Sequence, residues 1–230
     1  MTIILCDLAA ADDRIRFSPY CWRTKMALLH KGLEFETIPW RFTDKETIAP
    51  SGSTRVPVIV DGDKWIADSW KIALYLDETY PQRPLMDGDA VRSLCNFVNS
   101  WCDMSLNKAL RPLALLQVVA ILQDRDADYF RESREAMLGM SLEDSCADLS
   151  VARTALIEVL APAERDLSAH SFLGGGSPNY ADYALFGSLK WVHSVSGGIP
   201  LASDSTIQMW FDRILDLFDG YARSAPTAQS

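Results

Sequence analysis

The chain has 230 residues, 48% of them hydrophobic, and its 22 lysines and arginines against 31 aspartates and glutamates give a formal net charge of -9. This length can bury a sizeable core and accommodates one large domain or two small ones. The acidic balance argues against a nucleic-acid partner, because phosphate binding requires a basic face. We therefore expect a water-soluble globular protein.

The N-terminal residues predict a first strand over Thr2–Leu8, since their apolar run is too short for a signal peptide or a membrane helix. The cysteines form an odd set with no CxxC pair, and the three histidines are too far apart to suggest a zinc site. These features favour a reducing, cytoplasmic location without a structural metal. The cysteines are Cys6, Cys21, Cys95, Cys102 and Cys146.

A helix is predicted to begin at Ser18-Pro19 and to end at Gly32, because serine favours the N-cap and proline the first helical position. An N-cap serine needs no further role. A helix N-terminus also lowers the pKa of a nearby thiol, however, and a hydroxyl there can donate a hydrogen bond to sulfur. Cys21 lies at the same helix end, where it is either an activated thiol or a buried, inert side chain.

After a second predicted strand over 33–40 and a polar segment over 41–54, the run 55–80 predicts a strand, a hairpin, a strand and a helix. Asp61-Gly62 forms the hairpin turn. Pro57 lies inside the strand pattern and indicates either an edge position or a cis bond. With a cis bond, Val56 would offer its peptide groups to an extended ligand.

Asp68-Ser69 caps the helix that follows the hairpin. Capping alone explains this pair. The carboxylate can also face a ligand ammonium while the helix amides receive a ligand carboxylate, which together describe a site for an amino-acid group.

The remainder is predicted to be helical. A linker over 82–88 separates a first domain over 1–81 from a helical domain over 89–222, and 223–230 is predicted to be a flexible tail. Helices are expected over 90–119 with a kink at Pro112, 142–167, 180–195 and 204–221. Asn179 and Asp182 form an N-cap and N3 pair. The triple glycine at 174–176 predicts a turn, because no GxxxxGK pattern accompanies it.

Val56-Pro57 followed by Asp68-Ser69 resembles the glutathione site of the glutathione S-transferase superfamily, and FSPYCWRTK resembles its first-helix motif. The resemblance implies an N-terminal thioredoxin-like domain, βαβ–ββα, and an all-α C-terminal domain, with glutathione as co-substrate. Ser18 falls on the catalytic position. Val56 would pair with the cysteinyl backbone of glutathione, and Asp68 and Ser69 would hold its γ-glutamyl end, although most members have glutamate where this chain has Asp68.

The glycyl carboxylate of glutathione requires a cation. Solvated surface charge is the default interpretation for Arg41, Lys45 and Arg55, and Arg41 is the preferred candidate, with Arg55 beside the Val56-Pro57 pair.

The fuller resemblance is to the bacterial β-etherase group, which uses glutathione to open β-aryl ethers. It implies a small hydrophobic electrophile, no membrane partner and a homodimer. The acceptor site is expected beside Ser18, although each of its residues could equally be core filler. Those residues are Tyr20, Trp101, Cys102 and Met104. The alternatives are a glutathione-dependent isomerase or thiol-disulfide reductase, and a non-catalytic glutathione- or ligand-binding protein.

Overall fold

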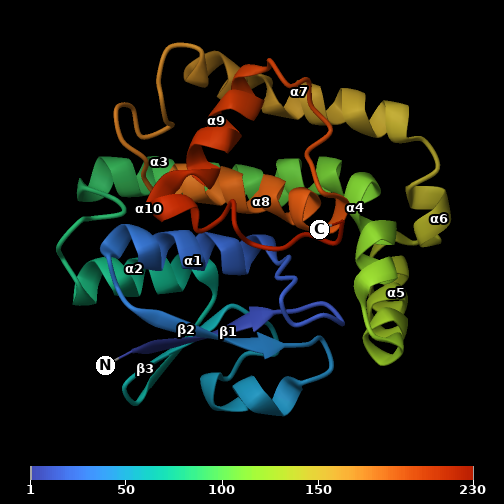
Figure 1. The fold of residues 1–230 in the computed structure, drawn as a ribbon, viewed down its shortest axis with the longest axis horizontal. Helices are drawn as coiled ribbons and strands as arrows, with labels where there is room; N and C mark the ends of the chain where they lie inside the picture. The colour runs from blue at the N-terminus through green and yellow to red at the C-terminus, as the bar shows by residue number, and fades with distance from the viewer. Residues whose placement is uncertain (1, 230) are drawn as a thin grey trace.

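The computed structural model describes residues 2–229 and divides the chain into a sheet-containing layer and a helical layer (Figure 1). Positions 1 and 230, which begin the predicted first domain and end the predicted tail, lie outside the described residues. Within residues 2–229 no helix is long and apolar enough to cross a membrane.

The N-terminal layer holds a four-stranded sheet in the order β2-β1-β3-β4. The pairing of β1 with β2 is parallel, and the pairings of β1 with β3 and of β3 with β4 are antiparallel. This is the βαβ–ββα arrangement that the sequence predicts. Its elements are β1 (Ile3–Leu8), α1 (Pro19–Lys31), β2 (Phe35–Trp40), the 3-10 helix η1 (Lys45–Ser51), β3 (Val58–Asp61), β4 (Lys64–Ala67) and α2 (Ser69–Thr79).

The C-terminal layer is helical throughout its regular elements. They are α3 (Gly88–Trp101), the π-helical turn η2 (Cys102–Leu106), α4 (Asn107–Ile121), α5 (Asp124–Leu138), α6 (Leu142–Ser145), α7 (Leu149–Leu167), α8 (Tyr180–Ser196), α9 (Thr206–Leu215) and α10 (Leu217–Gly220). In Figure 1 α1 and α2 lie between the sheet and this layer. The buried side chains of both layers form one continuous hydrophobic cluster.

Helix α8 lies at the centre of the helical layer, and almost all of its residues are buried. Asn179 and Asp182 form the predicted capping box at its N-terminus. The Asp182 carboxylate also accepts hydrogen bonds from the Leu173 and Gly174 amides at 2.8 and 3.0 Å and from the Trp210 indole at 3.0 Å. One short side chain therefore joins the glycine-rich loop, α8 and α9.

Three of the expected helices have different bounds in the structure. The helix expected over 90–119 is interrupted by the π-helical turn η2, while Pro112 lies inside α4. The helix expected over 142–167 is two helices, since Asp148 caps a new start by accepting from the Ser150 and Val151 amides. The helix expected over 204–221 ends at Leu215.

The segment expected to be a flexible tail contacts α8. The Ala228 amide donates to the Ser194 carbonyl at 2.8 Å, and Ala222, just before this segment, is fully buried.

Candidate active site

Three strand termini lie together at one end of the sheet, which is called the site edge below. The register pairs Cys6 with Val58 and Val58 with Ala67, so the end of β1, the start of β3 and the end of β4 are neighbours. Because α1 follows β1 through a loop and α2 follows β4 directly, the N-termini of both helices lie near this edge. Of the site residues predicted on the N-terminal domain, those at these element ends are Ser18, Val56, Pro57, Asp68 and Ser69.

Ser18 is the N-cap of α1, as predicted. Its hydroxyl oxygen accepts a hydrogen bond from the Cys21 amide at 3.2 Å, and the residue is only 3% exposed. The first helical residue is Pro19, whose missing N–H costs no helical hydrogen bond at this position. The Ser18 O–H is not needed for capping, since the cap uses the oxygen as acceptor. The hydroxyl can therefore act as a donor, and the side chain of the buried Cys21 is a hydrogen-bond neighbour with which a ligand would share it.

Val56 and Pro57 are joined by a cis peptide bond. The ladder of β3 begins only at Val58, and within residues 2–229 the Val56 peptide groups have no hydrogen-bond partner. The strand predicted to include Val56 and Pro57 is therefore shorter than expected. Next to this free peptide, the Pro57 carbonyl accepts from the Asp68 amide at 3.2 Å.

Asp68 caps α2 with one carboxylate oxygen, Oδ1, which accepts from the Trp70 and Lys71 amides at 3.0 Å each. The other oxygen has no hydrogen-bond partner among the described residues, and Asp68 is exposed. Its backbone has φ 81°, a left-handed value that non-glycine residues adopt uncommonly. Ser69 follows at the first helical position and is 4% exposed. A free carboxylate oxygen and a helix N-terminus thus lie side by side.

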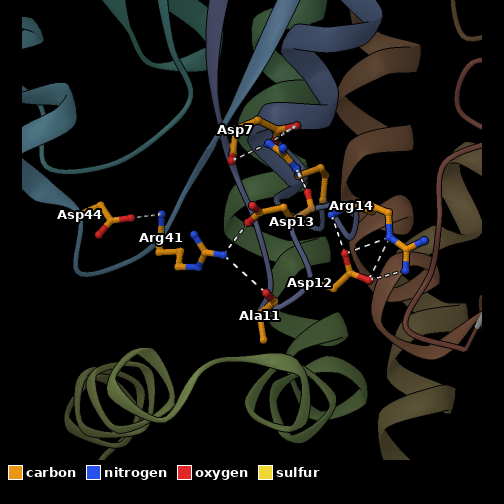
Figure 2. A network of polar contacts seen from close by, with 8 residues as sticks. Asp7, Ala11, Asp12, Asp13, Arg14, Arg41 and Asp44 are labelled. Carbon is orange, nitrogen blue, oxygen red and sulfur yellow. Dashed lines mark hydrogen bonds and ion pairs between the residues drawn. The ribbon is translucent and has the colours of Figure 1, made fainter.

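Arg41 does not present a free charge to this edge. Its guanidinium forms an ion pair with Asp13 and donates to the Ala11 carbonyl, and Figure 2 shows both contacts in the loop that follows β1. Arg55 is exposed and its guanidinium has no carboxylate partner in the described chain, while Lys45 donates to the Thr54 carbonyl at 2.8 Å. Of the three cations considered in the sequence for the ligand carboxylate, Arg55 and Lys45 are therefore better placed to meet it than Arg41.

Cys21 is fully buried behind the start of α1. Burial, and secondarily the negative charge of Asp7, raise the pKa of its thiol far above the ordinary value. A thiol that stays protonated is a poor nucleophile. Of the two interpretations that the sequence leaves open for Cys21, the structure favours the inert one.

The residues expected to line an acceptor site fall into three environments. Tyr20 is 37% exposed in the first turn of α1, with the Arg23 guanidinium 4.8 Å from its ring centroid. Trp101 is half-buried at the end of α3, and Met104 is 66% exposed. Cys102 has no exposed surface, and burial raises the pKa of its thiol to about 12. The prediction that Cys102 lines an open site is wrong, because the π-helical turn directs it into the core.

The sequence gives no signal for a buried contact between α1 and the helical layer. The fully buried Arg23 donates to Asn99 at 2.9 Å and to Ser188 at 3.2 Å, and it pairs with Asp103 at 2.8 Å. Gly187 lies directly against α1, since a Cβ there would overlap the Pro19 carbonyl oxygen. Only a residue without a side chain allows α8 to approach this closely.

Comparisons with known proteins agree with this architecture. Residues 17–79 match the family profile described as glutathione S-transferase, N-terminal domain, and residues 93–214 match that of the C-terminal domain. Over 101 residues the chain is 40% identical to glutathione S-transferase Z1 of Arabidopsis thaliana, covering 38% of this chain and 44% of that protein. Over 110 residues it is 34% identical to glutathione S-transferase Z2 of the same plant, covering 45% and 47%. The chain thus spans about half the length of these curated relatives.

A solved structure provides a longer match. The crystal structure of a glutathione S-transferase of Ceriporiopsis subvermispora in complex with glutathione superposes with a TM-score of 0.83 at 26% identity, over 96% of this chain and 98% of that one. Both domain profiles match in order, and the match to the C-terminal profile covers more than half of the residues of this chain. The chain therefore belongs to the glutathione S-transferase family.

Proposed function

We propose that this chain is a glutathione transferase in which the glutathione thiolate attacks an electrophilic carbon of an aryl-bearing substrate. The observation that carries the proposal is the placement of a free peptide at Val56, a free carboxylate oxygen at Asp68 and the hydroxyl of Ser18, a potential donor, at one end of the sheet, the site edge. These groups match the backbone, the ammonium and the sulfur of a γ-glutamyl tripeptide thiol.

Each group has a distinct part in binding. The Val56 peptide pairs with the cysteinyl backbone in the manner of an added strand. The free oxygen of Asp68 receives the γ-glutamyl ammonium, and the N-terminus of α2 at Ser69 receives the adjoining carboxylate, as expected for an anion at a helix start. Arg55 or Lys45 meets the glycyl carboxylate. The role of Arg41 is then structural, since Asp13 already neutralises it.

In the reaction the thiol first releases its proton to solvent water, and the sulfur then forms a bond to the electrophilic carbon as the leaving group departs with its electron pair. Ser18 stabilises the thiolate by donating its hydroxyl proton in a hydrogen bond, while the amides and dipole of α1 add positive potential. No residue has to change its protonation state for this stabilisation. Ser18 therefore lowers the pKa of the bound thiol.

The test measures glutathione binding and turnover separately. Calorimetry should detect glutathione binding to the wild type, and chlorodinitrobenzene should be conjugated. We expect Ser18→Ala to lower kcat/KM by about a hundredfold, as for loss of one preorganised donor, and to raise the pKa of the bound thiol. The control is Ser203→Ala, an exposed serine in the loop before α9. Absence of glutathione binding would refute the proposal, and binding without turnover would favour the non-catalytic alternative.

Cleavage of β-aryl ethers is our proposal for the reaction class within this activity. The thiolate would attack the carbon that bears the aryloxy group, form a C–S bond and release a phenolate. Chromatographic detection of phenol released from a β-aryl ether dimer tests it. Glutathione-dependent release that is lost in Ser18→Ala supports ether cleavage. Conjugation of aryl halides without phenol release would leave the transferase activity and contradict the ether specificity.

Thiol-disulfide reduction is, beside isomerisation, one of the two enzymatic alternatives, and the state of Cys21 opposes it. Serine at the N-cap cannot form a mixed disulfide, and the Cys21 thiol is buried with a raised pKa. We expect Cys21→Ser to leave transferase turnover unchanged. Hydroxyethyl disulfide reduction that disappears only in Cys21→Ser would overturn the assignment of Ser18 as the reacting centre.

We further propose that the chain forms a homodimer through the exposed apolar face of α3. Leu94 and Phe97 are 66% and 71% exposed, and Trp101 lies on the same face of the helix. Large apolar side chains clustered at the surface are typical of protein interfaces. Light scattering should give a dimer mass for the wild type and a monomer mass for Phe97→Glu. The control Ile157→Glu, at a 59% exposed position of α7, should stay dimeric.

A cytoplasmic location is also proposed. Cys6, Cys21, Cys95, Cys102 and Cys146 are all free and buried. A reducing compartment suits this state, because thiols persist there. Fractionation of the source cells with antibody detection would place the protein, and recovery outside the cytoplasm would contradict the proposal.

A further inference from the structure

Arg111 on α4 and Arg134 on α5 differ from the other arginines of the chain. Of the arginines within residues 2–229, they alone are partly buried without a carboxylate partner: the other partly or fully buried arginines form ion pairs, and the remaining unpaired ones are exposed. A cation that is partly removed from water and has no carboxylate partner is stabilised further by a ligand anion, beyond what aromatic faces or a neutral hydrogen-bond partner provide. Such positions are unexpected in a protein with a net charge of -9.

A chain of aromatic contacts connects Arg134 to the start of α1. Its guanidinium lies 4.6 Å from the Phe130 ring centroid and 5.8 Å from that of Phe42. The Phe42 ring is 6.3 Å from Phe17, the residue immediately before Ser18. Arg134 is thus held on aromatic faces on the side of the α1 N-terminus where the helical layer meets the thioredoxin-like domain.

Arg111 belongs to the same group of charges. Burial is the main reason that the pKa of Arg134 is lowered, and the like charges of Arg55 and Arg111 lower it further. Arg111 also acts on Tyr20, where its positive charge offsets part of the rise that burial causes in the pKa of the phenol. The positive charges of Arg111 and Arg134, both from the helical layer, therefore interact electrostatically with the Tyr20 phenol, at the exposed end of α1.

Glutathione does not account for these two charges. Its glycyl carboxylate needs one cation, and Arg55 and Lys45 flank the segment leading to Val56 on the thioredoxin-like domain. Arg111 and Arg134 come from α4 and α5 of the helical layer, which we expect to contribute the site of the second substrate. The surroundings are aromatic: Tyr20 and Tyr129 are 37% and 38% exposed.

We propose that the electrophilic substrate is an aromatic compound carrying a carboxylate or another fixed oxyanion, and that Arg111 and Arg134 bind this anion. Guanidinium groups match the geometry of a carboxylate and bind it through charge-assisted hydrogen bonds. The aryl ring lies against Tyr20 and Tyr129, with its reactive carbon toward the thiolate. The inference rests on the proposed transferase function, and it narrows the substrates of that function to anionic aryl electrophiles.

The test compares chlorodinitrobenzoate with chlorodinitrobenzamide, which has the same ring and no charge. In both, the thiolate forms a bond to the ring carbon and chloride leaves with its electron pair. After division by the uncatalysed rate constant, we expect the wild type to favour the benzoate in kcat/KM. Arg111→Gln and Arg134→Gln should each reduce that preference by about tenfold, as for the loss of one charge-assisted contact, with KM for glutathione unchanged.

Control variants distinguish the loss of a positive charge at the site from unfolding of the protein and from a change in its overall charge. Arg111→Lys and Arg134→Lys keep the positive charge and should retain most of the preference. Arg125→Gln removes the same charge at an exposed position at the start of α5 and should change nothing. Thermal melting confirms that each variant is folded.

A binding measurement separates the two proposals. Calorimetry with nitrobenzoate and nitrobenzamide, without glutathione, should show binding of the anion only, and binding lost in the double variant Arg111→Gln/Arg134→Gln. If glutathione is conjugated with no preference for the benzoate, the anion proposal fails and the transferase function stands. If anion binding persists without turnover of either halide, the transferase function fails and the anion site stands. A rise in KM for glutathione alone would assign the arginines to the glycyl carboxylate and overturn the inference.

Discussion

Lys190 on α8 should make the stability of this protein depend on pH in a predictable direction. Its side chain is fully buried, and Nζ donates to the Ala222 carbonyl at 2.9 Å and lies 3.2 Å from His193 Nδ1. Burial, followed by the charges of Lys25 and Arg223, lowers the pKa of Lys190 to about 7. Lys25 itself is paired with the buried Asp7 at 2.9 Å, and no ion pair joins Lys190 to a carboxylate within the described residues.

The direction in which stability changes with pH follows from the number of protons that the folded and unfolded states bind. In the unfolded chain a lysine has a pKa of about 10.4, so between about pH 7 and 10.4 the unfolded state holds a proton at Lys190 that the folded state has released. The contribution of Lys190 to the free energy of unfolding is therefore complete above about pH 10.4 and is lost as the pH falls through about 7. The change amounts to about 1.4 kcal/mol per pH unit, or about 2 kcal/mol between about pH 7.5 and pH 9.

Urea unfolding of the wild type and of Lys190→Met at both pH values measures this contribution, because all other titrating groups are shared. The free-energy difference between the two proteins should move by about 2 kcal/mol in favour of the wild type at the higher pH. The pKa of His193, about 4, lies outside the range examined. Lys108→Met, at an exposed position, should track the wild type. A difference that does not change with pH would show that Lys190 remains charged in the folded protein and would refute the reasoning.

Two further predictions concern packing. Asp182→Asn should lower the free energy of unfolding by about 3 kcal/mol or more. The reason is that the new NH2 group would face two of the four N–H donors from which the carboxylate accepts at 2.8–3.0 Å. A loss below about 1 kcal/mol in urea unfolding would contradict this prediction. Gly187→Ala should cost about 2 kcal/mol by forcing α8 away from Pro19 of α1, and it should lower the melting temperature. Gly176→Ala, where an added Cβ meets nothing within 4 Å, is the control, and equal melting temperatures would refute the close-approach argument.

The parts of the site predictable from sequence are those made by local hydrogen bonds. Ser18 accepts from an amide three residues later, and Asp68 from amides two and three residues later. Such caps involve only a few neighbouring residues, so residue type and order are enough to predict them. The same holds for the capping box of Asn179 and Asp182.

The parts that the sequence could not predict depend on segments distant in the chain. Arg41 was the preferred cation for glutathione, yet it pairs with Asp13, a residue 28 positions earlier. Cys102 is among the residues expected to line the acceptor site, but it lies in a π-helical turn that no residue pattern signals, and it is buried. Arg111 and Arg134 look like ordinary surface charges in the sequence. Their half-buried, unpaired state emerges only when α4 and α5 pack near the start of α1.

The placement of Ser18 depends on the helical layer as well as on the sheet. Arg23, just over one turn beyond Ser18 on α1, is fully buried and bound to Asn99 and Asp103 on one side and to Ser188 on the other. Removing one partner would leave a buried guanidinium incompletely paired, which is strongly unfavourable. The N-terminus of α1 is therefore held by α3, η2 and α8 together. A thioredoxin-like domain separated from the helices would keep the sequence motif of the proposed site but lose the contacts that fix its position.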